Sequence, residues 1–313
     1  MTTSVRAAAA WLDSLDSRQR AQALYDLDGG DLSNWNYTPR RRPGLALRDQ
    51  SRTQQQAVFA LLETVCSDDG LRKVRDVLRL EGILGELTGR PDYRDPENYA
   101  LALFGQPSDQ APWAFRFEGH HVSLTFTFVP DQGVAVTPHF LGSNPAIVPS
   151  RHTHAGFELL REERERALAI VAALDPALRD SARINWTMPS DIVTGPGREQ
   201  SLRSPAGLAM ASMHGSAQEA VMQLIAAFAG NLRGPLAGDS MARIREHGTD
   251  GIHFGFAGEP EIGRPHYFRL HGPSVLIEYD DTRGNHVHAV WHDPTDSFGS
   301  DRLRQHYDES RHD

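Results

Sequence analysis

Cysteine is almost absent from this chain of 313 residues, in which Cys66 stands alone. No disulfide can form within the chain, so nothing in the sequence demands an oxidising compartment. Because Cys66 continues an apolar helical stripe, we expect it to be a buried small hydrophobe rather than a nucleophile.

Long apolar runs and a basic surplus are also missing. No stretch approaches the ~18 apolar residues that a membrane span needs, and the first residues contain Asp13 and Asp16 without the apolar core of a signal peptide. The net charge of −9 at pH 7 disfavours nucleic-acid binding, which needs a surplus of Lys and Arg. We therefore expect a cytoplasmic protein that binds neither nucleic acid nor a membrane; no oligomeric state is indicated.

Several well-known catalytic motifs are absent too. The chain has no phosphate-binding G-x-x-x-x-G-K-[ST] loop, no G-x-G-x-x-G after a strand, no H-E-x-x-H and no G-x-S-x-G. These absences disfavour standard nucleotide hydrolases, dinucleotide enzymes, zincins and α/β-hydrolases.

Hydrophobic periodicity predicts a mixture of helices and strands. The predicted helices cover residues 1–27, 58–65, 71–78, 158–174 and 221–228. The predicted strands cover 115–129, 134–140, 267–279 and 286–291, with a long Pro/Gly/Ser-rich loop at 186–207 and a polar, partly helical tail at 293–312.

The sequence also repeats itself. Shifted by 153 residues, Gly105–Val122 matches Gly258–Val275 at seven of 18 positions without a gap, and chance would give about one. We predict an α+β fold of duplicated helix–helix–β-hairpin units in a pseudo-twofold arrangement with an antiparallel sheet. The chain would be a single module over 1–313 with repeats at about 50–145 and 155–300. The alternative is that two hairpins resemble each other by convergence.

Histidines supply the candidate chemistry. Residues two apart on a strand share a face, so His286 and His288 would point the same way and could hold a metal ion. By the same alternation His120 would lie on the apolar face and His121 on the polar face. We predict His121, His286 and His288 as metal ligands. The predicted catalytic residues are His120 and Glu278. If the turn between the last two predicted strands has an odd number of residues, such as 281–285, Glu278 faces His288 and Asp280 faces His286.

Arginines supply the candidate substrate contacts. Arg40, Arg42 and Arg116 are the predicted substrate-binding residues, because a guanidinium offers paired donors to a carboxylate or phosphate. The alternative for Arg40 and Arg42 is a solvated basic loop. A second H-x-H pair, His152 and His154, lies in a Ser/Arg/Thr/Gly stretch and is expected to be solvated.

Three segments resemble a known family. They are Trp113 to His121, Thr137 to Pro145, and the long motif from Ile277 through Asn285-His286-Val287-His288-Ala289-Val290-Trp291 to Tyr307. Together with Trp35 to Leu45 they resemble the bacterial and fungal family called domain of unknown function 3500. That family has Arg where this chain has His292, so His292 is not counted as a ligand. The resemblance implies a single module from about residue 30 to 307 and no established reaction.

Three functions remain open from the sequence. The first is an enzyme that acts on a small molecule with a divalent transition metal (Fe, Cu or Zn), with oxidoreductase chemistry favoured over hydrolysis. The second is a metal-free enzyme in which His121, His288 and Glu278 transfer protons. The third is a protein that binds a small molecule without catalysis.

Overall fold

The computed structural model describes residues 2–185, 187–281 and 284–310, which fall into two compact units. Unit 1 comprises Met1–His139 and Thr295–Asp313, and unit 2 comprises Phe140–Pro294. Both mix α-helices with mostly antiparallel strands, as the sequence predicts. Within the described ranges, no helix is long and apolar enough to cross a membrane.

Unit 1 begins with helices whose ends are set by capping side chains. The predicted helix over 1–27 is divided in two, because Asp16 leaves the helical path and accepts a hydrogen bond from the Gln19 N–H to start a new helix. The helices are α1 (Thr3–Asp13), α2 (Ser17–Ala23), α3 (Arg52–Leu62) and α4 (Asp68–Thr88), with the short η1 (Leu47–Asp49) before α3. The predicted stripes at 58–65 and 71–78 fall on α3 and α4.

The sheet of unit 1 has the strand order β1-β3-β4-β5, with β2 paired to β3 and β6 paired to β5. The strands are β1 (Leu24–Tyr25), β2 (Leu45–Ala46), β3 (Ala100–Phe104), β4 (Trp113–Gly119), β5 (Val122–Val129) and β6 (Gly133–Ala135). The tail returns to this unit as η4 (Ser297–Gly299) and α9 (Ser300–Ser310), where the Phe298 N–H donates to the Thr137 carbonyl.

The predicted strand over 115–129 is wrong as a single element. Gly119 pairs with Val122, so His120 and His121 form a two-residue turn between β4 and β5. His121 adopts the left-handed conformation with φ 63°, which histidine tolerates better than most residues. The predicted strand over 267–279 divides at the equivalent place, where the Gly272 N–H donates to the Val275 carbonyl.

Unit 2 follows the same order of elements. Its helices are α5 (Arg161–Ala173), α6 (Pro176–Ala182), α7 (Gly215–Ala229) and α8 (Gly234–Glu246), with η2 (Met210–Ser212) before α7. Its strands are β8 (Arg183–Asn185), β9 (Leu208–Ala209), β10 (His253–Gly258), β11 (His266–His271), β12 (Leu276–Asp281) and β13 (Val287–His292). The strand order is β7-β13-β12-β11-β10-β8, with β9 paired to β10; β7 (His139–Ser143) begins at the last residue of the first segment of unit 1.

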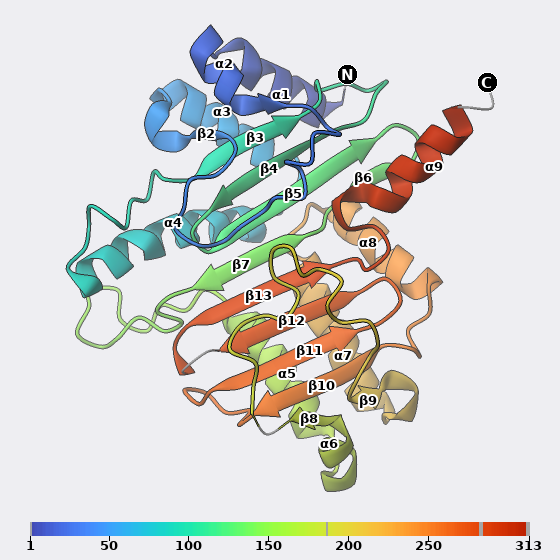
Figure 1. Ribbon diagram of the computed structural model, residues 1–313. Coiled ribbons are helices and arrows are strands. Elements are labelled where there is room, and N and C mark those ends of the chain that lie inside the picture. The colour runs from blue at the N-terminus through green and yellow to red at the C-terminus, as the bar shows by residue number, and fades with distance from the viewer. Residues whose placement is uncertain (1, 186, 282–283, 311–313) are drawn as a thin grey trace. The chain divides into compact units, whose positions relative to one another are not determined.

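Each sheet has an apolar face and a polar face. In unit 2 the apolar face carries Phe268, Ile277 and Trp291 and is covered by α5 and α7 (Figure 1). A segment without helix or strand, 187–207, lies over the opposite face of β10 to β13 and is drawn in yellow in Figure 1. In unit 1 the segment 28–44 crosses the polar face, where the Asn36 N–H donates to Glu118.

Candidate functional site

The polar face of unit 2 gathers carboxylate and imidazole side chains. Asp280 of β12 pairs directly with His288 of β13, and Glu278 pairs with Val290. Directly opposite residues share a face, so both acidic side chains lie on the face that carries His288. The prediction that Glu278 stands opposite His288 is wrong by two residues, because β12 continues through Asp281 and the pairing is displaced along the strands.

His288 is the centre of this cluster. Its Nδ1 is 2.7 Å from Oδ1 of Asp191, which comes from the 187–207 segment, and its side chain is 11% exposed. Asp191, Asp280 and His288 each offer one ligand atom, and these atoms all lie within 4.8 Å of one another. Three side chains of metal-ligand type therefore meet at one largely buried point in unit 2.

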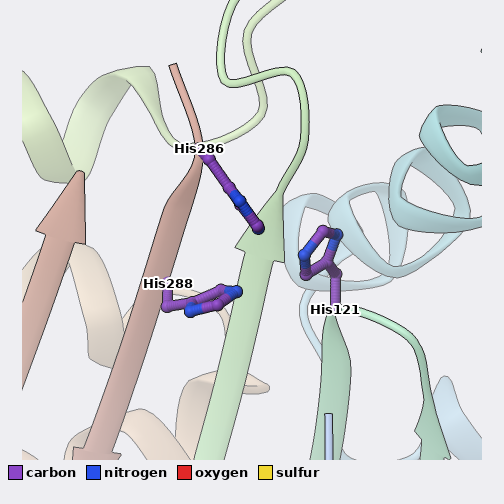
Figure 2. A group of neighbouring side chains, drawn as sticks. All are labelled: His121, His286 and His288. Atoms are coloured by element: carbon purple, nitrogen blue, oxygen red, sulfur yellow. The ribbon is translucent and has the colours of Figure 1, made fainter. Parts of the chain in front are cut away.

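His286 stands beside His288, just before β13 begins. The two ring centroids are 4.7 Å apart in an edge-to-face arrangement, and both side chains are seen in Figure 2. The backbone N–H of His286 donates to Asp281. The predicted proximity of His286 and His288 is thus present, although His286 precedes the strand rather than lying in it.

Glu278 binds the covering segment. Its fully buried carboxylate accepts hydrogen bonds from the backbone N–H groups of Val193 and Thr194, both at 2.8 Å, from the Thr194 hydroxyl, and from the Tyr267 hydroxyl at 2.6 Å. Burial, followed by the charge of Glu278, raises the pKa of Tyr267 well above its usual value. These contacts place Glu278 as a positioning residue for Asp191, which is two residues before Val193.

His292 fixes the same segment from the end of β13. Its Nε2 is 3.0 Å from the Thr194 carbonyl oxygen, to which it donates, and its side chain is buried. Burial lowers the pKa of His292, so the neutral imidazole is the form that the fold favours. His292 lies on the face of His288, as expected if the strand runs that far.

In unit 1, His120 belongs to a buried ionic cluster. Its Nδ1 hydrogen-bonds to Glu81 of α4, and Arg94 lies 3.2 Å from the same nitrogen and 3.6 Å from Glu81. The Tyr99 hydroxyl donates to the His120 carbonyl. The cluster ties the β4–β5 turn to α4, a contact that the sequence did not indicate.

His121 follows in the same turn, with its ring stacked on that of His120 at 3.7 Å. Figure 2 shows that its side chain projects from this turn. The prediction that His120 is the more buried of the two is wrong, since His120 is 9% and His121 4% exposed. Strand alternation does not apply to residues that form a turn. His121 belongs to unit 1 and His286 and His288 to unit 2, and their predicted convergence stays a prediction.

The predicted substrate arginines have three different surroundings in unit 1. Arg116 is 1% exposed, pairs with Glu118 at 3.0 Å and donates to backbone carbonyls of the 28–44 segment. Arg42 is also buried, with its guanidinium 3.8 Å from Glu118. Arg40 lines a cavity of about 1030 Å³ together with Arg41 and Arg48. Arg42 also lines this cavity, so Arg40 and Arg42 both adjoin a space for a ligand, whereas Arg116 supports the fold.

Asp191 and Asp280 are the functional candidates that sequence reasoning left out of the ligand set. Asp280 could have been chosen, because it shares the alternation of Glu278 on the same strand. Asp191 carries no such signal, because 97 residues separate it from His288 and it lies in an irregular segment. Cys66 is buried as expected, and burial raises the pKa of its thiol to about 12.

Comparisons with curated proteins and with solved structures give no match for this chain. A match to a sequence family covers residues 1–300, which include all of unit 2, unit 1 apart from residues 301–313, and every residue of the candidate site. The motif from Ile277 to Trp291, which carried the resemblance, forms β12 and β13 and brings Asp280 and His288 together. The chain belongs to the family described as "Protein of unknown function (DUF3500)".

Proposed function

We propose that this protein is a metal-dependent enzyme whose metal centre lies in unit 2, on His288, Asp280 and Asp191. The observation that carries the proposal is the meeting of their three ligand atoms within 4.8 Å on the segment-covered face of the sheet. Imidazole and carboxylate ligands without a thiolate suit Fe, Zn or Cu. His286 is the further ligand candidate of this unit, because its ring lies against His288.

A divalent transition metal bound there would supply Lewis-acid or redox chemistry, and oxidoreductase chemistry is favoured over hydrolysis. The protein's own residues hold the site in place. Glu278 and His292 form hydrogen bonds with the 187–207 segment, and these hydrogen bonds hold Asp191 of that segment beside His288. The substrate would be a small molecule and the setting cytoplasmic. His121 as a ligand remains part of the proposal on the basis of sequence alone.

We also propose that the two units arose by duplication. The 153-residue shift aligns β3 with β10, β4 with β11 and β5 with β12. A second shift of 163 residues matches 44–61 to 207–224 at seven of 18 positions. Under that shift Gln55 donates to the Leu47 carbonyl in unit 1 as Gln218 donates to the Met210 carbonyl in unit 2. The metal-ligand residues are then a specialisation of the second copy.

A second candidate function rests on the contact between Asp191 and His288. A carboxylate 2.7 Å from Nδ1 fixes the imidazole tautomer with its proton on that nitrogen, which leaves the lone pair on Nε2. This arrangement would suit a general base that works without a metal. The two functions differ in metal content, so one experiment separates them.

The test is elemental analysis of the untagged full chain. We expect about one equivalent of a transition metal in the wild type and its loss in His288→Ala and Asp280→Asn. The matched control is His152→Ala/His154→Ala, which removes the other H-x-H pair, in an irregular segment, and should keep the metal. Metal-free wild type with catalytic competence would support the second candidate, and loss of metal from the control alone would contradict the first.

A further inference from the structure

Arg269 of β11 is a buried guanidinium without a carboxylate partner. It is 8% exposed and shares a hydrogen bond with the Tyr267 hydroxyl. Its Nε is buried with no hydrogen-bond partner, and among the residues that the structure describes Arg269 forms no ion pair. Arginine stays charged at any physiological pH, and a buried charge without a counter-charge is strongly disfavoured. An anion bound to the Arg269 guanidinium would therefore stabilise it.

The nearest acidic side chain does not supply that anion by direct contact. Glu278 stands opposite Arg269 in the register of β11 and β12. Its oxygens are taken by Val193, Thr194 and Tyr267. Glu278 thus holds the 187–207 segment and leaves the guanidinium without a bidentate partner.

Unit 1 shows the same position with its anion in place. Arg116 precedes Arg269 by 153 residues and pairs with Thr125 just as Arg269 pairs with Glu278, so the two arginines occupy the same place in their sheets. Arg116 is neutralised by Glu118, two residues further along the same face, at 3.0 Å. The arginine is common to both units, and the units differ in the side chain two residues further along the strand.

Unit 2 has His271 where unit 1 has Glu118. His271 is 6% exposed, and its Nδ1 is buried without a hydrogen-bond partner in the described part of the chain. Burial first, and then the charges of Arg269 and His253, lower the pKa of His271 to about 4. The imidazole is therefore neutral near pH 7 and brings a donor rather than a negative charge.

We infer that Arg269 and His271 bind a carboxylate group of a small-molecule ligand, in the place that the Glu118 side chain fills in unit 1. A carboxylate fits because its two planar oxygens match the guanidinium fork, as those of Glu118 do. The 187–207 segment passes over this place: Thr194 contacts Glu278 on one side, and the Ala206 carbonyl lies over Gly255 on the other. A ligand enters when that segment opens.

The subsite adjoins the proposed metal centre. Tyr267, two residues from Arg269 on the same face, stands opposite Asp280. His288 lies two strands away from Arg269 and two residues further along. The usual spacings within and between strands put the two residues about 12 Å apart. A substrate held by its carboxylate would thus present an atom several bonds away to the metal. Calling the bound carboxylate a substrate rests on the proposed function, whereas the binding itself does not.

The experiment uses acetate as the probe on the untagged full chain. Thermal unfolding is followed in sodium acetate and in sodium chloride at equal ionic strength and pH 7. The unfolding midpoint of the wild type should be about 2–4 °C higher in acetate than in chloride, at an acetate concentration tenfold above the dissociation constant of the acetate complex. Arg269→Gln should abolish this rise. The matched control, Arg264→Gln, removes an exposed arginine paired with Glu259 and should retain it.

His271→Glu gives the sharpest variant, because it rebuilds the Arg-x-Glu pair of unit 1. It should raise the unfolding midpoint without acetate and remove the response to acetate. A wild type that does not respond, or a full response in either Arg269→Gln or His271→Glu, overturns the subsite. Metal content separates the two proposals: these two variants should keep the metal, whereas His288→Ala should lose the metal and keep the acetate response.

Discussion

At the scale of single residues, Arg116 is held between a buried carboxylate and backbone carbonyls in unit 1. Arg116→Gln would remove the nearer of the two guanidinium groups that face the buried Glu118, with that of Arg42 remaining 3.8 Å away, and we expect a loss of about 3 kcal/mol in the free energy of unfolding. The control is Arg75→Gln, which breaks an exposed pair with Glu63 and should cost about 0–1 kcal/mol. Urea denaturation measures both, and equal losses would contradict a structural role for Arg116.

His139 is a residue whose burial makes stability depend on pH. It is 3% exposed, and burial, with the nearby charge of Lys73, lowers its pKa to about 3. The unfolded chain binds a proton at this imidazole below about pH 6.5, whereas the folded protein does not. The contribution of the neutral His139 side chain to the free energy of unfolding is therefore complete above about pH 6.5 and is lost as the pH falls toward 3.

The corresponding variant is His139→Phe, which cannot bind that proton. Between pH 6 and 4 the wild type should lose about 1.4 kcal/mol more per pH unit than the variant in its free energy of unfolding. Chemical denaturation at several pH values gives the two curves. If they run parallel, His139 does not remain neutral in the folded protein.

At the scale of elements, the 187–207 segment depends on its anchors on β12 and β13. Glu278→Gln offers one acceptor oxygen and turns an amide N–H group toward the donors of Val193 and Thr194. We expect faster tryptic cleavage at Arg198 and metal affinity about 10–100-fold lower, as for other residues that orient ligands. Glu259→Gln, which alters an exposed glutamate, is the control, and identical behaviour of the two variants would contradict the anchoring role.

The strands also show where sequence reasoning succeeds and where it fails. The helical stripes of α3, α4, α5 and α7 and the strand β13 are predictable, because each has one uninterrupted period. The turn between β4 and β5 was missed, although its signal is present: apolar residues fall on odd positions through Phe117 and on even positions from Val122. Such a change of phase marks a turn of two residues. Because it was overlooked, His120 and His121 were wrongly predicted to lie on a strand.

The contacts of Asp191 could not have been predicted in this way. Local periodicity describes elements, whereas the approach of Asp191 to His288 depends on a long irregular segment that folds back over the sheet. The hydrogen bonds that fix its course go to Glu278 and His292, both far away in sequence. Tertiary contacts of this kind leave no period in the sequence.

At the scale of the whole molecule, the two units use one register for different purposes. Unit 1 places Arg116, Glu118 and Thr125 where unit 2 places Arg269, His271 and Glu278. In the first set, the arginine is neutralised by the glutamate of the same strand. The second set leaves an arginine for a ligand and a glutamate for the segment that carries Asp191. The chemistry of the protein is therefore expected in unit 2.

The most direct measurement is an anomalous-scattering experiment on crystals of the untagged full chain grown with Zn²⁺. We expect one strong peak about 2.0–2.2 Å from a ring nitrogen of His288 and from an oxygen of Asp280. A nitrogen of His121 at the same distance would also establish the sequence-based ligand. No peak beside His288, or a peak only at His152 and His154, would contradict the metal centre.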